Sequence, residues 1–283
     1  MQADIAVIGG TGVYDTAMLD NVREVEIDTP FGKPSDAITI GSFGEINVAF
    51  LPRHGKGHRI SPGKLNYRAN ILALKKLRVK RIISASAVGS LKLEHKPLDI
   101  VIPDQIFDRT RLRDSTFFED GIVAHIGFAD PFCPQMSSMI AGVTRDLGYS
   151  IHEKGTYVCM EGPQFSTRAE SRVYQSLGFD IIGMTALPEA KLAREAEICY
   201  CMIATVTDYD VWHETDVNIE TVISNAIKNE EAVRRIIKEA IPKISLERSC
   251  VCSNALAGAI VTASDKIPVE TKRKLNDLIG KYL

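Results

Sequence analysis

The sequence lacks the segments that mark a secreted or membrane-spanning protein. No apolar run reaches the roughly 18–20 residues that are needed to cross a bilayer. Residues 1–8 contain neither the basic segment nor the apolar segment of a signal peptide. We therefore expect a cytoplasmic protein with no membrane partner.

An excess of charge of either sign is also missing. The 283 residues include 34 basic and 36 acidic side chains, which gives a net charge of -2. Such a balance produces no long-range field that would attract nucleic acid or an anionic membrane, so we expect no nucleic-acid partner. A local cluster of basic residues can still bind a small anion.

A dinucleotide-binding motif is incomplete. Gly9-Gly-Thr-Gly12 follows an expected strand, but the fingerprint read from Gly10 needs a third glycine where the chain has Asp15. This disfavours an NAD-dependent dehydrogenase. What is left is a tight turn whose backbone N–H groups suit an anion, with Thr11 adding a hydroxyl.

The six cysteines lack the spacing of a metal site. Two pairs are separated by one residue, Cys199/Cys201 and Cys250/Cys252, whereas zinc ligands usually have wider spacing and include histidines. We therefore expect no metal ion. Either the thiols are reduced and mostly buried, or some of them form structural disulfides. Cys199 and Cys201 would point to the same side of one strand, so each is expected to pair elsewhere rather than with the other.

Neither internal repeats nor a linker interrupt the chain, and we expect a single α/β domain over residues 1–283. The expected strands are residues 4–8, 22–27, 37–40, 46–51, 81–90, 99–103, 151–160, 180–185 and 198–204. The expected helices are residues 66–77, 139–147, 188–196, 219–241 and 269–279.

Asp208 and Asp210 follow the apolar run at 198–204, at the end of a buried strand. In an extended segment, side chains two residues apart point to the same side, so the two carboxylates would face one place. Ligands of open α/β sheets bind outside the carboxyl ends of strands. The alternative interpretation is a solvated acidic loop.

A second polar group follows other strands. Arg53 and His54 lie in a glycine-rich basic loop, and Ser86 and Thr185 lie near the ends of two further strands. The planar guanidinium of arginine suits phosphate, although a solvated basic loop is the alternative. Phosphate beside a carboxylic acid suits phosphorolysis of a glycosidic bond, because phosphate can attack the sugar carbon while the acid protonates the leaving base.

Specific segments strengthen this interpretation, and they run in one order through residues 4–245. They are Ile8-Gly-Gly-Thr-Gly12, Thr29-Pro-Phe-Gly-Lys-Pro-Ser-Asp36, Arg53-His54-Gly, Asn66-Tyr67, Gly89-Ser-Leu91, Asp130-Pro-Phe-Cys133, Glu161-Gly-Pro, Phe165-Ser166, Met184-Thr185 and Thr207-Asp-Tyr-Asp210. Together they resemble the 5′-methylthioadenosine phosphorylases, in the trimeric branch of the purine nucleoside phosphorylase family. The resemblance implies a central mixed twisted sheet flanked by helices, and phosphorolysis to adenine and 5-methylthioribose 1-phosphate in purine and methionine salvage.

The resemblance also implies a role for each matching residue. Asp208 would protonate or hydrogen-bond purine N7, and Asp210 would accept from the 6-amino group. His54 would be catalytic as well as phosphate-binding. The phosphate ligands would be Thr11, Arg53, His54, Ser86, Ala87 and Thr185. The nucleoside would contact Phe165, Ser166, Met184, Asp208, Asp210, Ile219, Val222, Ile223 and His125. No cofactor is implied, because inorganic phosphate is a co-substrate.

Assembly and specificity are implied in the same way. His125 would reach in from a neighbouring subunit of a trimer, or of a hexamer of paired trimers. The tail Ser249–Cys252 resembles C-x-C tails of thermophilic members, in which disulfides and hexamers occur. The apolar residues at 219, 222 and 223 favour a methylthio group, whereas a broader purine nucleoside phosphorylase that also uses adenosine or inosine is the alternative. Gly183 departs from the pattern, because relatives commonly have Asn there.

Overall fold

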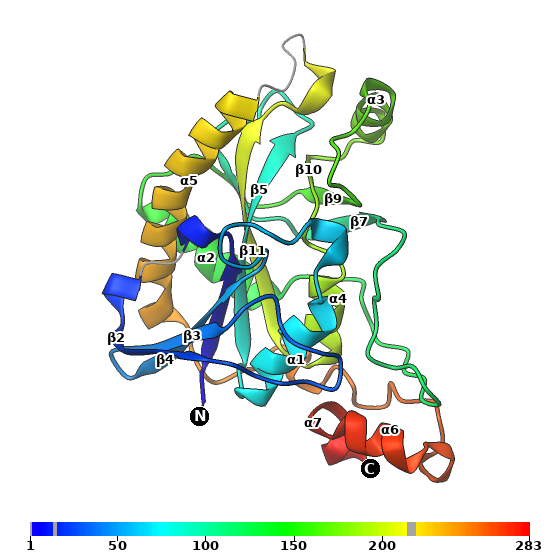
Figure 1. Ribbon diagram of the computed structural model, residues 1–283. Coiled ribbons are helices and arrows are strands. Elements are labelled where there is room, and N and C mark those ends of the chain that lie inside the picture. The colour runs from blue at the N-terminus through cyan, green and yellow to red at the C-terminus, as the bar shows by residue number, and fades with distance from the viewer. Residues whose placement is uncertain (1, 14–15, 214–218) are drawn as a thin grey trace.

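The computed structural model describes residues 2–13, 16–213 and 219–283. Within these ranges eleven strands form one mixed sheet, with helices on both faces (Figure 1). The strands are β1 (Ile5–Gly9), β2 (Asp20–Val25), β3 (Ile38–Phe43), β4 (Ile46–Pro52), β5 (Arg81–Ser90), β6 (Ile100–Val101), β7 (Gln105–Arg109), β8 (Ile151–His152), β9 (Thr156–Met160), β10 (Ile181–Gly183) and β11 (Cys199–Asp208). The α-helices are α1 (Tyr67–Lys76), α2 (Pro134–Asp146), α3 (Arg168–Ser176), α4 (Glu189–Glu195), α5 (Ile219–Ala240), α6 (Val269–Lys274) and α7 (Asn276–Ile279). The expected mixed sheet with flanking helices is confirmed.

β5 is the central strand of the sheet. It pairs in parallel with β11 along its length and with β1 through its first half, and it pairs antiparallel with β10 near its end. From β5 the sheet extends through β1, β4 and β3 to β2. It also extends from the last residues of β5 through β10 and β9 to β7. β5 and β11 continue beyond the ends of β1 and β4. The loops that follow β1 and β4 can therefore lie beside the second half of β5.

Alternating side chains of the central strands divide the core into two layers. On β11, Cys201 and Ile203 pack in the layer with α2 and α5, whereas Tyr200 and Met202 pack in the layer with α1 and α4. This alternation follows from the two-residue repeat of a strand. Both faces of β11 are buried, which explains why its sequence is a continuous apolar run instead of an alternating one.

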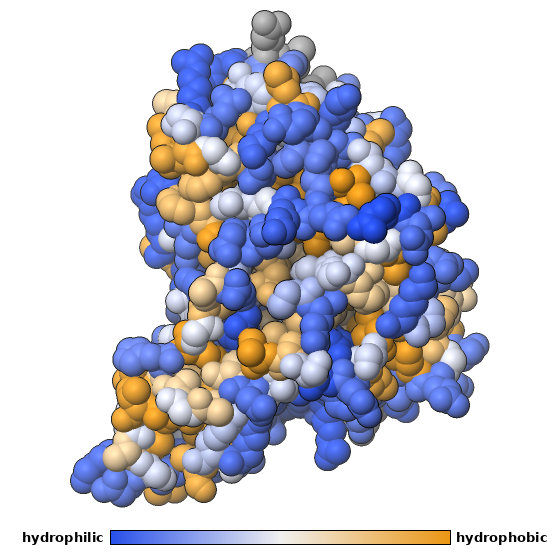
Figure 2. Space-filling view, turned by 180° about the vertical axis from the view of Figure 1, so that it is seen from behind, coloured by the Kyte–Doolittle hydropathy of each residue, from blue (hydrophilic) through white to orange (hydrophobic). Residues whose placement is uncertain are grey.

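Two expected elements are divided in the structure. Residues 151–160 form two strands instead of one, because β8 pairs with β6 whereas β9 lies between β7 and β10. The expected helix at 269–279 is interrupted at Leu275, between α6 and α7. These two helices project from the body at one corner (Figures 1 and 2). Among the described helices, none combines the length and apolar character required to cross a bilayer.

The cysteines differ from the sequence expectation. All six lie in the described ranges and carry free thiols, so the structure contains no disulfide among them. The expectation of no metal site relied on ligand spacing along the chain, and that criterion misses a cluster that forms only in space. The chain brings four sulfur atoms within 4.8 Å of one another, from Cys133, Cys199, Cys250 and Cys252. Their spacing along the chain does not indicate this, because they come from three separate segments.

Candidate functional site

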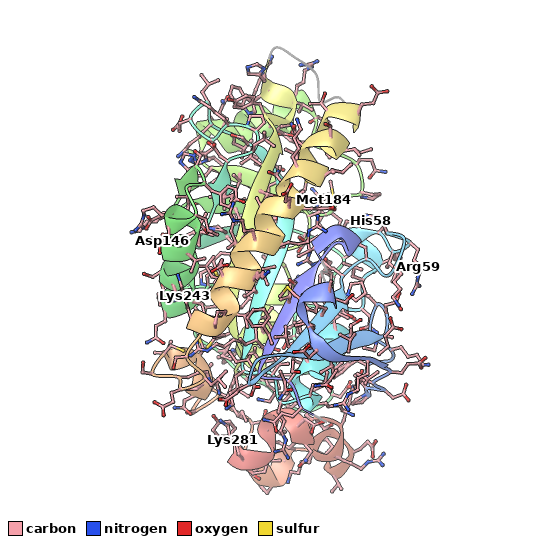
Figure 3. All side chains as sticks on the ribbon, turned by 90° about the vertical axis from the view of Figure 1, so that its left-hand side faces the viewer. His58, Arg59, Asp146, Met184, Lys243 and Lys281 are labelled. Atoms are coloured by element: carbon pink, nitrogen blue, oxygen red, sulfur yellow. The ribbon has the colours of Figure 1, made fainter. Side chains whose placement is uncertain are left out.

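A cavity of about 490 Å³ lies at the ends of β5, β10 and β11 and under the first turns of α5. Its walls include the predicted residues Arg53, His54, Ser86, Ala87, Phe165, Met184, Thr185, Asp208, Asp210, Val222 and Ile223. Met184 and His58, which both line the cavity, lie beside α5 in Figure 3. A larger surface groove of about 770 Å³ runs beside α6 but contains none of the predicted residues. We therefore take the smaller cavity as the candidate site.

Four predicted residues do not belong to the described cavity wall. Ser166 is buried just behind it, with its hydroxyl 3.6 Å from the sulfur of Met160. His125 is exposed and lies outside the cavity, where its backbone N–H donates to the carbonyl of Ala259 at 2.8 Å. Thr11 begins a short 3-10 helix after β1, and Ile219 begins α5; the side chains of both lie outside what the structure describes.

Two groups of side chains occupy different parts of the cavity. We call Arg53, His54, Ser86 and Thr185 the hydroxyl end, and Asp208 and Asp210 the acid end. The register of β5 and β11 pairs Ser86 with Ala204 and Gly89 with Asp208. The two ends are therefore three residue steps apart along β5, which corresponds to about 10 Å.

The two aspartates converge by a mechanism other than the expected one. Strand alternation does not bring them together, because the strand ends at Asp208 and Asp210 opens a 3-10 turn with φ 47°. This left-handed conformation is uncommon for a residue with a side chain. It is held by two hydrogen bonds: the N–H of Asp210 donates to Oδ1 of Asp208 at 2.8 Å, and the Ser171 hydroxyl donates to Oδ2 of Asp210 at 2.6 Å.

The two carboxyl groups of the acid end hold a proton more strongly than carboxyl groups in water do. Burial raises the pKa of Asp208 above the ordinary value, although the Thr207 hydroxyl and the Asp210 N–H stabilise the charged form. Burial also raises the pKa of Asp210, against the effect of the Ser171 hydroxyl. β5 approaches so closely that a Cβ at Gly89 would lie 3.2 Å from Oδ1 of Asp208. A carboxyl in this position can hold a proton and transfer it to a ligand.

Arg53 is not part of a solvated basic loop, because it is 2% exposed. Its Nε and Nη2 donate to the carboxylate of Glu189 at 2.8 and 3.0 Å, and its Nη1 donates to the carbonyl of Ala85 at 2.9 Å. Glu189 is fully buried at the start of α4 and also accepts from the hydroxyls of Ser84 and Tyr200. This buried ion pair fixes the position of Arg53 at the edge of the cavity. Glu189 was not found from the sequence.

The remaining groups of the hydroxyl end are neutral. The hydroxyls of Ser86 and Thr185 lie 3.0 Å apart. Burial, together with the nearby charge of Arg53, lowers the pKa of His54 to about 4. Nδ1 of His54 lies 2.8 Å from the carbonyl oxygen of Ile60, so we assign the ring proton to Nδ1 and leave Nε2 as an acceptor.

The segment that carries Met184 and Thr185 is held by two residues that the sequence did not reveal. The Tyr157 hydroxyl accepts from the N–H of Thr185 at 3.3 Å, and Arg113 donates to the carbonyls of Met184 and Leu187 at 2.7 and 2.6 Å. Tyr157 also explains the departure at Gly183. A Cβ there would lie 2.0 Å from the Tyr157 hydroxyl, so in this chain the tyrosine fills the space of a side chain at 183.

α5 is attached to the end of β11 by two asparagines. Asn225 and Asn229 donate through Nδ2 to the carbonyls of Thr207 and Val206 at 2.8 and 3.0 Å. Because these residues are four apart, both lie on one face of the helix. Their attachment fixes the rotation of α5 and presents Val222, Ile223 and Ala226 to the cavity.

Comparisons with known proteins show the family to which the chain belongs. Residues 4–242 match the model of the phosphorylase superfamily. The chain belongs to this family. A full-length relative from Koribacter versatilis, named S-methyl-5′-thioadenosine phosphorylase, is 53% identical and covers 100% of this chain and 97% of its own length. A relative of the same name from Nitrosopumilus maritimus is 54% identical over 90% of this chain and 97% of its own.

Solved structures agree with the sequence relatives. A methylthioadenosine phosphorylase from an antarctic soil metagenomic library superposes with a TM-score of 0.94 and 49% identity, over 98% of this chain and 99% of that one. A mutant of an adenosine/methylthioadenosine phosphorylase from Schistosoma mansoni, solved in complex with methylthioadenosine, has a TM-score of 0.83 and 36% identity. That match covers 87% of this chain and 93% of the other. The predicted resemblance to 5′-methylthioadenosine phosphorylases is confirmed.

Proposed function

We propose that the protein catalyses phosphorolysis of 5′-methylthioadenosine to adenine and 5-methylthioribose 1-phosphate. The observation that carries this proposal is one cavity with an acid end, a hydroxyl end and an apolar helix wall. A phosphate oxygen forms a bond to C1′ of the ribose, and the bond from C1′ to N9 breaks with its electron pair moving into the purine. A proton from Asp208, or a hydrogen bond from it, neutralises the charge that develops at N7.

The hydroxyl end holds phosphate in this proposal. The Ser86 and Thr185 hydroxyls donate to its oxygens, and Thr11 and the backbone of Ala87 add further contacts. Arg53 contributes from the edge of the cavity, where Glu189 already fixes its orientation. His54 is neutral, because its pKa is lowered to about 4, so its Nε2 can accept a hydrogen bond from a protonated phosphate oxygen and orient the phosphate for attack.

The acid end binds adenine in this proposal. Asp208, whose pKa is raised, supplies the proton or hydrogen bond at N7. Asp210 accepts from the 6-amino group, which a carboxylate can do and which the carbonyl of a 6-oxopurine does not allow. Phe165 and Ser166 border the base, and Met184 contacts the ribose. The acid pair therefore favours adenine nucleosides over inosine.

The 5′ side and the assembly complete the proposal. Ile219, Val222 and Ile223 form the apolar surface for the methylthio group. His125, which lies outside the cavity of its own chain, reaches the site of a neighbouring subunit in a trimer or a hexamer of paired trimers. Apolar side chains on the surface support such an assembly, since Leu112 is 86% exposed, and Figure 2 shows hydrophobic patches on one face. We expect no cofactor in catalysis, and we expect the enzyme to work in the cytoplasm.

The proposal is tested by initial rates with methylthioadenosine, adenosine and inosine, each with and without phosphate. We expect release of adenine that depends on phosphate and is fastest with methylthioadenosine. Equal or faster cleavage of inosine would contradict the assignment of the acid pair and would favour a general purine nucleoside phosphorylase. Cleavage that is independent of phosphate would contradict the role of the hydroxyl end, and the absence of cleavage would favour a nucleoside-binding protein.

A further inference from the structure

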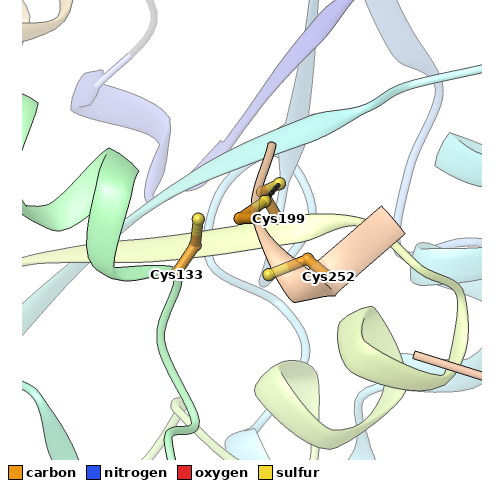
Figure 4. A group of neighbouring side chains, drawn as sticks. Cys133, Cys199 and Cys252 are labelled. Carbon is orange, nitrogen blue, oxygen red and sulfur yellow. Dashed lines mark hydrogen bonds between the residues drawn. The ribbon is translucent and has the colours of Figure 1, made fainter. Parts of the chain in front are cut away.

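Four cysteine thiols meet at the opposite end of β11 from Asp208. Cys199 is the first residue of β11, Cys133 precedes α2, and Cys250 and Cys252 belong to the C-terminal segment. Their sulfur atoms lie within 4.8 Å of one another, and Sγ of Cys199 and Sγ of Cys250 are 3.3 Å apart. Figure 4 shows Cys133, Cys199 and Cys252 close together, on three separate segments of the chain.

The separation of the sulfur atoms fits one tetrahedral metal ion. In a Cys₄ zinc site each Zn–S bond is about 2.3 Å, so sulfur atoms at the corners of the tetrahedron lie about 3.8 Å apart. Three of the cysteines are buried and Cys250 is half-buried, as in a structural site whose four positions are all filled by protein ligands. Histidine, carboxylate and water ligands are not needed.

A buried arginine next to the cluster indicates that this region carries negative charge. Arg81 is 4% exposed, and its Nη1 lies 3.9 Å from Sγ of Cys199. Its Nε has no hydrogen-bond partner, and within the described ranges no carboxylate forms an ion pair with it. A buried guanidinium without a counter-charge is costly. Four thiolates around a divalent ion carry a net charge of -2 and would supply that counter-charge.

The position of Cys133 favours a thiolate as well. Cys133 is the N-cap residue of α2, a helix of 13 residues whose first turn begins with Pro134. Backbone N–H groups at a helix N-terminus and the helix dipole stabilise an anionic sulfur there. The site therefore offers a sulfur at a helix start and a guanidinium beside a second sulfur, and both surroundings stabilise the thiolate form that binds metal.

From these contacts we propose that Cys133, Cys199, Cys250 and Cys252 bind one zinc ion. The ion fastens the C-terminal segment and the start of α2 to the start of β11. The strand from Cys199 to Asp208 spans about 30 Å, so the ion is a structural link and takes no part in the chemistry of the cavity. The inference stands independently of the proposed function.

The first experiment measures the metal content of the full chain, purified without chelator, by mass spectrometry of the elements. We expect one zinc per chain and four thiols that react only after the zinc is released. Replacement by Co²⁺ should give the absorption bands of a tetrahedral cobalt thiolate. Zinc far below one per chain, together with a mass lowered by four hydrogens, would overturn the proposal in favour of two disulfides. One iron per chain would overturn the choice of zinc.

Matched alanine variants locate the site. Cys252→Ala removes a proposed ligand, whereas Cys201→Ala removes a buried thiol that lies on the same strand as Cys199 but outside the cluster. We expect zinc content to fall at least tenfold in Cys252→Ala and to stay at one per chain in Cys201→Ala. Equal zinc content in the two variants would contradict the assignment. If Cys252→Ala does not fold, the thiols of the unaltered protein are modified stepwise and the released zinc is measured. Zinc release in step with the modification of four thiols would give the same information.

A chelator tests the structural role. We expect it to lower the Tm of the unaltered protein by about 5 °C or more and to leave the Tm of Cys252→Ala unchanged. The initial rate of nucleoside cleavage at 25 °C should be the same before and after zinc removal. An unchanged Tm after complete zinc removal would contradict a structural link.

Discussion

The hydroxyl end and the acid end of the cavity hold buried charge in opposite ways. At the hydroxyl end, the guanidinium of Arg53 is balanced by Glu189, and both side chains are almost completely buried. At the acid end, neither Asp208 nor Asp210 forms an ion pair with a described residue, and burial raises the pKa of both. The comparison separates two tasks. A balanced pair keeps its charge and fixes geometry, whereas an unbalanced acid can change its protonation state during a reaction.

The comparison is tested most strongly by Asp208→Asn. An amide has the shape of the carboxyl but cannot give up a proton, so we expect kcat for methylthioadenosine to fall by about 10²–10⁴-fold. The free energy of unfolding should stay the same or rise, because the variant removes an acid that is unfavourably buried. Steady-state kinetics and urea unfolding measure the two effects.

Asp210→Asn is the matched comparison for this prediction. Its carboxylate is oriented by Ser171 and accepts a hydrogen bond in the proposed complex without transferring a proton. We therefore expect Asp210→Asn to raise KM for adenine nucleosides more than it lowers kcat. Full turnover by Asp208→Asn would show that the buried acid is not the proton donor.

The next largest effect is expected from Glu189→Gln. Removing one partner of a buried ion pair leaves the other charge uncompensated, which typically lowers the free energy of unfolding by about 3–5 kcal/mol. Glu195→Gln is the control on the same helix. Glu195 is also buried, but its pKa is raised to about 7 and it bonds to Thr116 and the backbone of Phe117 without a cation. Glutamine should replace it with a much smaller change. Equal losses in urea unfolding of both variants would contradict a special role for the Arg53 pair.

Glu189 also shows where prediction from sequence ends. Arg53 and Asp208 could be found because each follows an apolar run that is readable as a strand, and strand ends collect ligands in α/β sheets. The partner of Arg53 lies 136 residues away at the start of α4, where no sequence motif distinguishes Glu189 from other acidic residues in the first turn of a helix. The pairing of the central strands and the packing of α4 against α1 and β11 bring the two together, and no local pattern encodes this arrangement.

The same limit explains the other differences between prediction and structure. The expected strand at 151–160 is divided because its two halves pair with different strands, a property of the sheet and not of the segment. The four-cysteine cluster escaped a search for ligand spacing, since Cys199 and Cys250 are 51 residues apart. Asp208 and Asp210 were correctly placed together, but by a turn with positive φ that alternation does not predict.

A smaller effect is expected from His54, through pH. The pKa of this histidine is about 4 in the folded chain, against 6.5 as the ordinary value. Between these pH values the unfolded chain binds a proton that the folded chain does not, so the free energy of unfolding falls as pH is lowered from 6.5 to 4, in total by roughly 3 kcal/mol. In His54→Gln this part of the pH dependence should disappear. The other five histidines remain in both proteins, so the difference between their urea-unfolding curves isolates His54. Identical pH dependence would show that the pKa of His54 is the same in the folded and the unfolded chain.

The smallest effect concerns the apolar wall that joins the two ends. Ile223 and Ile227 are one turn apart on α5 and similarly exposed, at 54% and 61%, but only Ile223 lines the cavity. Ile223→Thr removes apolar contact with a methylthio group and offers a hydroxyl to a 5′-hydroxyl. We therefore expect the ratio of kcat/KM for methylthioadenosine to that for adenosine to fall about tenfold or more. Ile227→Thr should leave the ratio unchanged, because its side chain contacts neither substrate. If both variants shift the ratio equally, the change arises from the helix as a whole. The 5′ group would then be recognised elsewhere in the site.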